Sequence, residues 1–250
     1  MKIILFLTLL SLSFAQESNE PAEITSFFGG NISLMGSFPQ GELKDQEVPW
    51  GIGLDINAMY NINDHLAFGL NLGGLQYGKT SRQIPFNYFS DLVYITEETT
   101  NNLGYGHVFV RIVPFSGPVK PYIEGLVGVK NLTTATKLFN ENCVDDPDTD
   151  HDDCEIASSK NLTDNALSYG AGTGINVILT TLKDEDGNSQ GEILFYLGFK
   201  YIWGGEADYL KQGDITFSNP EDGPVVTSWT PSTSRTDLMQ FNIGVHFNSK

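Results

Sequence analysis

The C-terminal segment Thr236–Phe247 constrains the fold more than any other part of the chain, because its side chains alternate strictly in character. One set is bulky and apolar and consists of Met239, Phe241, Ile243, Val245 and Phe247. The intervening set consists of Gln240, Asn242, Gly244 and His246. Successive side chains of a strand point to opposite faces, so the segment is predicted to be a strand with one wholly apolar face.

The same alternation recurs seven more times along the chain. It covers residues 28–38, 50–60, 66–73, 104–114, 122–130, 167–179 and 193–203. The segments are close to the length that a tilted transmembrane strand requires, about 9–11 residues. Short turns alternate with three long polar connections, which cover residues 79–102, 131–165 and 204–235. The sequence therefore predicts an all-β fold, an eight-stranded antiparallel up-and-down transmembrane β-barrel with short periplasmic turns and long extracellular loops.

Composition and side-chain volume favour a membrane barrel over a soluble one. The chain has 26 glycines and 12% aromatic residues but only 18% charged residues, as membrane barrels do. A soluble barrel of the lipocalin type would turn its apolar faces inward, yet an eight-stranded interior is only just wide enough for the side chains that fill it. Residues such as Trp50, Phe195 and Phe199 would overfill that space. The apolar faces are therefore predicted to contact lipid.

Aromatic residues and prolines support the same placement of the strands. Amphipathic rings accumulate at both membrane interfaces. The expected outer-rim residues are Trp50, Tyr169 and Trp203, and the expected inner-rim residues are Tyr60, Tyr122 and Phe247. The prolines of the turn at residues 115–121 are expected outside the strands, because proline donates no hydrogen bond to a strand ladder.

The N-terminus has the features of an export signal. Residues 1–15 contain one lysine, a short apolar run and small residues at Ser13 and Ala15, which predicts a cleaved secretory signal peptide. The alternative is a membrane anchor, but the run is shorter than the roughly 20 apolar residues that span a bilayer. Residues 16–27 are then a periplasmic lead-in, and residues 28–250 form the barrel.

These eight segments and their alternating connections resemble the small eight-stranded outer-membrane barrel family, which includes OmpX and the transmembrane domain of OmpA. The resemblance implies a place in the outer membrane of a Gram-negative bacterium, with extracellular loops and both termini in the periplasm. It also implies contact with outer-membrane lipid and lipopolysaccharide. Phe241, Val245 and Phe247 resemble the aromatic-terminated segment that the barrel-assembly machinery reads.

Faces predicted to point into the lumen carry the charged residues Asp55, Arg111, Glu124 and Lys200. Charges in a low-dielectric interior must be paired, and the set contains two of each sign. Arg111 and Glu124 lie on neighbouring strands, while Asp55 and Arg111 are expected at similar depth. The set is predicted to plug the lumen together with Asn57, Asn71, Gln240 and Asn242. The alternative is a gated ion path.

The second long connection contains both cysteines of the chain, Cys143 and Cys154, which are expected to form a disulfide in an oxidising compartment. Between them lies a run of alternating aspartates. Its members are Asp146, Asp148, Asp150 and Asp152. Carboxylate oxygens are the ligands that Ca²⁺ prefers, although the spacing departs from an EF-hand loop. The loop either binds calcium or is a solvated acidic surface, and no other cofactor is expected.

No catalytic set is apparent in the sequence. The four histidines do not converge with a serine and an acid by spacing, so the protein is not expected to be an enzyme. A net charge of −17 without a cluster of Lys and Arg argues against nucleic acid as a partner. The expected role is structural, adhesive or complex-forming at the cell surface, through long acidic loops. The alternatives are a narrow porin-like pore or transporter for small hydrophobic substrates, and a subunit of an outer-membrane secretion or assembly complex.

Overall fold

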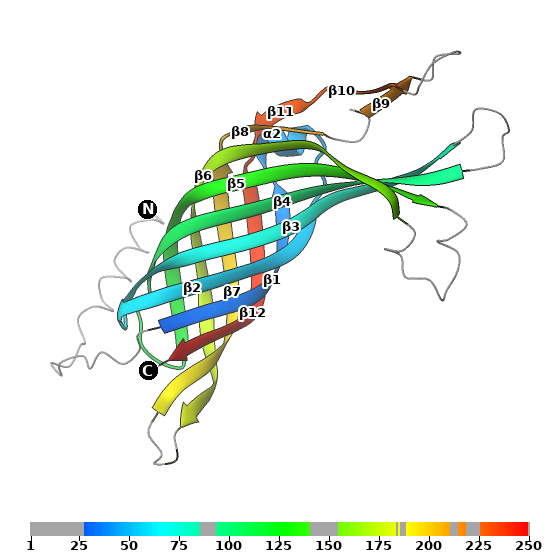
Figure 1. Cartoon of the computed structure of the whole chain (residues 1–250). Helices are drawn as coiled ribbons and strands as arrows, with labels where there is room; N and C mark the ends of the chain where they lie inside the picture. The colour runs from blue at the N-terminus through cyan, green and yellow to red at the C-terminus, as the bar shows by residue number, and fades with distance from the viewer. Residues whose placement is uncertain are drawn as a thin grey trace.

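The computed structural model describes residues 28–85, 94–140, 155–183, 185, 189–210, 215–218 and 226–249. Eight long strands form one closed antiparallel barrel, in which every strand pairs with its neighbour along the chain (Figure 1). Its strands are β1 (Phe28–Pro39), β2 (Gly51–Asn63), β3 (Leu66–Pro85), β4 (Tyr94–Ile112), β5 (Val119–Asn140), β6 (Glu155–Lys183), β7 (Ser189–Gly204) and β12 (Leu238–Ser249). The predicted all-β, eight-stranded up-and-down barrel is confirmed. The predicted signal peptide and lead-in, residues 1–27, lie outside the described residues.

The barrel closes where its first and last strands pair. The register runs from Phe28 opposite Ser249 to Pro39 opposite Leu238, so β12 pairs along its full length with β1 on one side and with β7 on the other. A closed sheet leaves no edge strand with unpaired N–H and C=O groups, which lipid cannot satisfy. The segment that predicted the fold is therefore also the segment that completes it.

Large apolar side chains cover the outside of the barrel on all eight strands. Many expose about half of their surface, as Leu70 does at 56% and Ile243 at 51%. One such residue from each strand is Ile32, Leu54, Leu70, Val108, Ile123, Tyr169, Leu197 and Ile243. Exposed apolar side chains all around a closed sheet form the lipid-facing surface of a transmembrane barrel.

The two ends of the barrel differ in what they carry. At one end, here called the turn end, the connections β2–β3, β4–β5 and β6–β7 lie close to the end of β12 (Figure 1). At the other, the loop end, lie the four remaining connections. No helix among the described residues is long and apolar enough to cross a bilayer.

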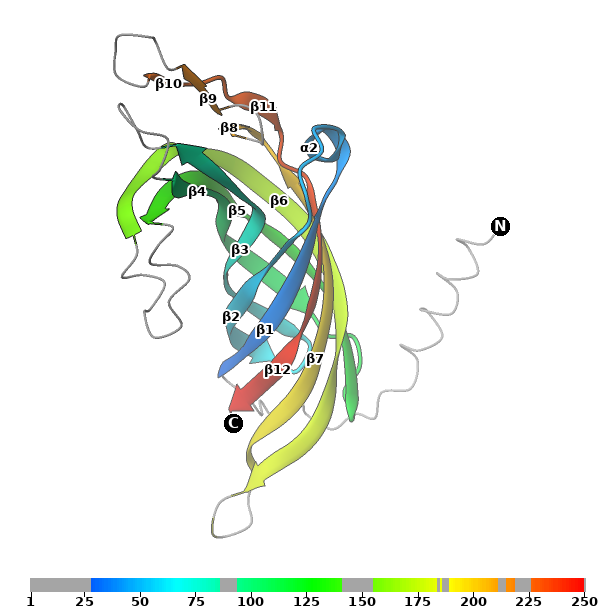
Figure 2. The ribbon, with the colours of Figure 1, turned by 90° about the vertical axis from the view of Figure 1, so that its right-hand side faces the viewer.

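Two of the three long connections predicted as loops are largely strand. β3 continues to Pro85 and β4 starts at Tyr94, and β5 and β6 are extended in the same way to Asn140 and from Glu155. These extensions form a four-stranded sheet that projects past the rest of the barrel (Figures 1 and 2). The prediction was wrong because polarity was taken as the mark of a loop. The extensions are rich in threonine, which favours strands, and outside the lipid neither face has to be apolar.

The other two loop-end connections also contain regular structure. Between β1 and β2 lies a five-residue helix, α2 (Gly41–Asp45). The segment between β7 and β12 contains β8 (Glu206–Tyr209) paired with β11 (Ser232–Arg235), and β9 (Ile215–Ser218) paired with β10 (Val226–Trp229). The backbone N–H of Arg235 donates to Glu42 Oε2 over 3.0 Å, which ties α2 to β11. Elements of four or five residues are too short to show periodicity in the sequence.

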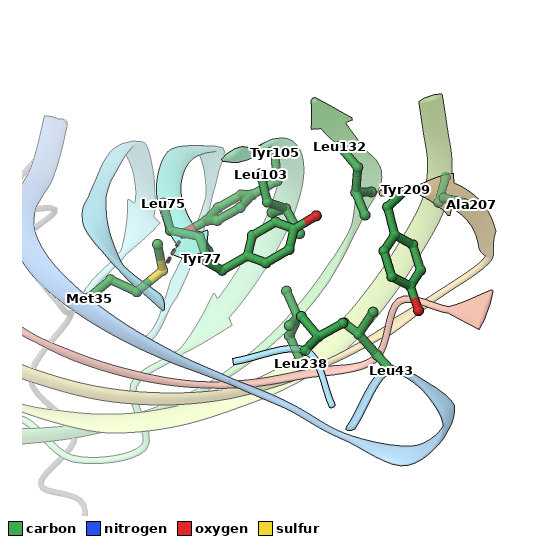
Figure 3. Close-up of a cluster of buried hydrophobic side chains, with 12 residues drawn as sticks. Met35, Leu43, Leu75, Tyr77, Leu103, Tyr105, Leu132, Ala207, Tyr209 and Leu238 are labelled. Atoms are coloured by element: carbon green, nitrogen blue, oxygen red, sulfur yellow. Dashed lines mark hydrogen bonds between the residues drawn. The ribbon is translucent and has the colours of Figure 1, made fainter. Parts of the chain in front are cut away.

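The loop end of the interior is filled with apolar side chains, here called the apolar cap. It comprises Met35, Leu43, Val48, Leu75, Tyr77, Leu103, Tyr105, Leu132, Ala166, Ala207, Tyr209 and Leu238. Figure 3 shows Leu43 of α2 and Tyr209 of β8 packed with residues of the barrel wall. The sequence predicted a polar plug in the lumen. The structure shows that the interior is apolar at its loop end. Leu43 is 2% exposed, so α2 lies over the mouth as part of this cap.

Two residues of β5, Pro121 and Tyr122, lie elsewhere than the sequence predicted. Pro121 lies inside the strand, opposite Ile175 of β6. It is tolerated because β4 ends at Ile112, opposite Ile123, so β5 has a single neighbour at Pro121. Tyr122 is 1% exposed and points into the lumen, so it is not an inner-rim residue.

Replacement of Leu43 by alanine tests the apolar cap. Because the side chain is buried, we expect the free energy of unfolding to fall by about 2–4 kcal/mol. The measurement is urea unfolding of the barrel refolded in lipid vesicles. Lys44→Ala, on the exposed side of the same helix, is the matched control and should leave stability unchanged. Equal stability of Leu43→Ala and the wild type would show that α2 does not contribute to the cap.

Candidate functional site

The lumen contains all four charged residues that the sequence placed there, and each is buried. They form two separate ion pairs. Lys200 Nζ lies 3.0 Å from Asp55 Oδ2, and Arg111 Nη2 lies 2.7 Å from Glu124 Oε2. Asp55 and Arg111 are thus not partners of each other. Each of these four charges is therefore paired with a charge of opposite sign.

Asp55 on β2 is the centre of the first pair and accepts hydrogen bonds from four side chains. Besides Lys200, its oxygens accept from Asn71 Nδ2 at 2.7 Å, Tyr105 Oη at 2.5 Å and Asn57 Nδ2 at 2.9 Å. Lys200 Nζ also donates to Asn71 Oδ1 at 3.2 Å. The carboxylate is therefore compensated by a cation and three neutral donors, as burial of a charge requires.

The second pair lies between β4 and β5, whose residues Arg111 and Glu124 are direct cross-strand neighbours. Both Nε and Nη2 of Arg111 donate to Oε2 of Glu124, over 2.9 and 2.7 Å. The guanidinium carbon lies 4.1 Å from the centroid of the Tyr122 ring. The Tyr122 and Tyr196 rings stack at 6.0 Å and 10°. Aromatic faces favour a desolvated cation, so the two rings shield Arg111 and fill the cross-section around it.

Several polar lumen residues were not singled out from the sequence. Lys130 is fully buried, and its Nζ donates to the backbone oxygens of Thr236 and Ile202 at 2.5 and 3.4 Å. His107 Nε2 lies 2.8 Å from Ser168 Oγ. Alternation had placed Lys130 and His107 on the inward face, but nothing in the sequence indicated their partners. The His107–Ser168 pair is buried within the barrel and lines none of the cavities described below.

At the turn end the lumen opens into a cavity of about 260 Å³. Arg111, Met59, Asn176 and His246 are among the residues that line it. Lys120 and Glu192 form an ion pair of 2.5 Å at its wall. Toward the loop end, a void of only about 10 Å³ is found beneath α2. The interior thus has a vestibule at one end and is packed at the other.

The remaining residues predicted from the sequence fall elsewhere. Phe241, Val245 and Phe247 lie on the lipid-facing side of β12, where each exposes between 36% and 48% of its surface. The predicted disulfide and the predicted calcium ligands lie outside the described residues. The predicted disulfide joins Cys143 and Cys154, and the predicted calcium ligands are Asp146, Asp148, Asp150 and Asp152. Within the described part of the chain, no group of three or more His, Cys, Asp or Glu residues is placed to hold a metal ion.

Comparison with known proteins gives structural likenesses of low similarity. No protein-family model and no curated protein matches the sequence. Neisserial surface protein A (NspA) is 13% identical, with 89% of this chain and 96% of that chain covered and a TM-score of 0.37. Ail, the attachment invasion locus protein of Yersinia pestis, is 12% identical, with 89% and 97% covered and a TM-score of 0.32. The outer membrane protease OmpT of Escherichia coli is 8% identical, with 92% and 100% covered and a TM-score of 0.34. Likenesses of this size carry no conclusion about function.

A single variant and its compensating double variant test the pairing of Asp55 and Lys200. Lys200→Met leaves a buried carboxylate without its cation, so the free energy of unfolding should fall by about 3–5 kcal/mol. The double variant Asp55→Asn/Lys200→Met should regain most of that loss, because an amide can keep the bonds to Asn71 and Tyr105. Urea unfolding in vesicles provides both values. A double variant no more stable than Lys200→Met alone would contradict the pairing.

Proposed function

We propose that the protein is an integral outer-membrane barrel of a Gram-negative bacterium that works through its surface rather than through its lumen. The loop end faces the cell exterior, and both chain termini face the periplasm. The role is structural, adhesive or complex-forming. The observation that carries the proposal is the closed lumen, which is blocked by two buried ion pairs and by the apolar cap.

The lumen supports a scaffold role because successive layers close it by different means. The Arg111–Glu124 pair is flanked by stacked tyrosines, and the Asp55–Lys200 pair is saturated with hydrogen bonds. The apolar cap lies beyond them and leaves a void no larger than one water molecule. An ion on this route would have to break both pairs and then cross apolar packing.

The loop end supports a surface role because most of the structure outside the lipid lies there. The extensions of β3–β6 add a four-stranded sheet, and the pairs β8–β11 and β9–β10 add two small two-stranded sheets. The acidic segment 141–154 connects β5 and β6 at the far end of this sheet. We propose the Cys143–Cys154 disulfide and calcium binding by the aspartates between them as properties of this segment.

Transport is the main competing function, and conductance measurements distinguish it from the proposed surface role. In planar lipid bilayers the wild-type protein should give no stepwise current. Arg111→Ala should also remain silent, because the Asp55–Lys200 layer and the apolar cap are still in place, although its stability in urea should fall. Reproducible current steps from the wild type that change with Arg111→Ala would overturn the closed lumen.

Deletion of residues 141–154 tests the surface role. The barrel should still fold, as shown by its heat-dependent shift in gel mobility, because the deleted residues lie beyond the ends of β5 and β6. Bacteria that display the shortened protein should lose adhesion, or the shortened protein should lose its partner in mild detergent. Replacement of the four aspartates by asparagine, with the cysteines retained, separates the charge of the segment from its length. Full activity of both variants in both assays would count against the segment as the working surface.

A further inference from the structure

The vestibule at the turn end is lined by polar side chains that come from several sides of the barrel. Its buried lining includes Arg111 of β4, Asn176 of β6 and His246 of β12, which are between 1% and 4% exposed. Met59 of β2 lies beside Arg111 in the same lining. These strands are distributed around the barrel, so closure of the sheet brings the four side chains to one cavity.

Polar atoms of this buried lining have hydrogen-bonding capacity that the described residues leave unused. Asn176 Oδ1 and His246 Nδ1 are buried without a hydrogen-bond partner in the described part of the chain. His246 Nε2 lies 3.0 Å from Asn248 Oδ1, which is an acceptor, so Nε2 carries the proton and Nδ1 is left as an acceptor. Arg111 Nη1 is directed at the thioether of Met59, a weak acceptor, over 3.8 Å. The cavity therefore offers one strong donor and two acceptors to a molecule that enters it.

The rim of the vestibule adds an aromatic ring and an ion pair. Phe115, in the connection between β4 and β5, lines the cavity and is 41% exposed. The ion pair of Lys120 and Glu192 is also partly exposed, at 23% and 19% of the two side chains. An exposed ring next to convergent polar groups can contact the apolar side of a ligand while the polar groups fix its orientation.

We propose that the vestibule binds a neutral pyranose sugar, either free or as the end of a glycan chain. A sugar hydroxyl both donates and accepts hydrogen bonds, so it can pair with Arg111 Nη1 and with the acceptors on Asn176 and His246. Phe115 offers an apolar surface against which the C–H groups of the sugar ring can pack. The cavity of about 260 Å³ is slightly smaller than the roughly 300 Å³ at which sites for drug-sized ligands begin, so it suits one ring rather than several.

The charges of the vestibule favour a neutral ligand over an ion. Arg111 is already paired with Glu124 at 2.7 Å. Lys120 is paired with Glu192 at 2.5 Å, and Asp64 adds a further carboxylate to the lining. An anion would have to compete with these carboxylates, and a cation would meet the two basic side chains. The vestibule lies at the opposite end from the apolar cap, so the inference goes beyond the proposed surface role and does not depend on it.

Sugar titration of the protein refolded in lipid nanodiscs, followed by NMR of isotope-labelled methionine methyl groups, tests the proposal. Met59 lines the vestibule, whereas Met35 belongs to the apolar cap and Met239 to the outer face of β12. The probes are D-glucose, D-galactose and D-mannose, each beside its uronate, in which a carboxylate replaces the terminal hydroxymethyl group. At least one neutral sugar should shift the Met59 signal saturably and bind about tenfold more tightly than its uronate. The signals of Met35 and Met239 should not move.

Two variants remove ligand contacts in different ways. Asn176→Leu replaces an unpaired buried amide by an apolar group of similar size, so it should weaken sugar binding about tenfold without lowering stability in urea. Phe115→Ala removes the exposed ring and should weaken binding to a similar extent. Phe28→Ala is the matched control, because this exposed ring lies at the same end of the barrel but on its lipid-facing side. It should keep the wild-type affinity.

A trisaccharide that ends in the bound sugar separates the two sources of the ligand. Affinity no higher than that of the monosaccharide indicates a free sugar, and higher affinity indicates a chain end.

Three results would overturn the proposal. They are a Met59 signal unmoved by every neutral sugar, tighter binding of a uronate than of its neutral sugar, and wild-type affinity in both Asn176→Leu and Phe115→Ala. If Asn176→Leu does not refold, Phe115→Ala decides alone, because Phe115 lies outside the strands. Nanodiscs are open on both sides, so the result is independent of the orientation that the proposed function requires.

Discussion

Satisfaction of backbone hydrogen bonds in lipid is the constraint on which the rest of this structure depends. A strand that meets hydrocarbon on one face must pair on both edges, and only a closed sheet allows this for every strand. The pairing of β1 with β12 supplies the closure. Closure then creates an interior that is too narrow for bulk water, and the side chains that point inward have to satisfy one another.

The interior meets this requirement with two kinds of packing. In its middle, Asp55 and Lys200 neutralise each other within a set of neutral donors, and Arg111 and Glu124 do the same between tyrosine rings. Toward the loop end, apolar side chains from the wall, from α2 and from β8 fill the space. Neither region leaves a continuous path through the barrel, so the interior is open only at the vestibule of the turn end.

Alternation in the sequence predicted the barrel, its strand number and the inward position of Asp55, Arg111, Glu124 and Lys200, because a period of two is fixed by strand geometry. It did not predict their partners. Asp55 and Lys200 lie on strands that are not neighbours, and their contact depends on the curvature of the whole sheet. The strand extensions were missed for a different reason. Alternation was recognised by an apolar outward face. Along the extensions the outward face of β3–β6 is polar, as at Asn131 and Thr133, so that signal disappears while the strand continues.

The distance between Asp55 and Lys200 along the chain, 145 residues, has a consequence for assembly. β2 and β7 are separated in the sheet by β1 and β12, so the two charges meet only when the last strand has joined the first. Until then each faces an open, hydrated concavity and remains solvated. Drying of the interior and formation of the ion pair are therefore one event, and it coincides with closure.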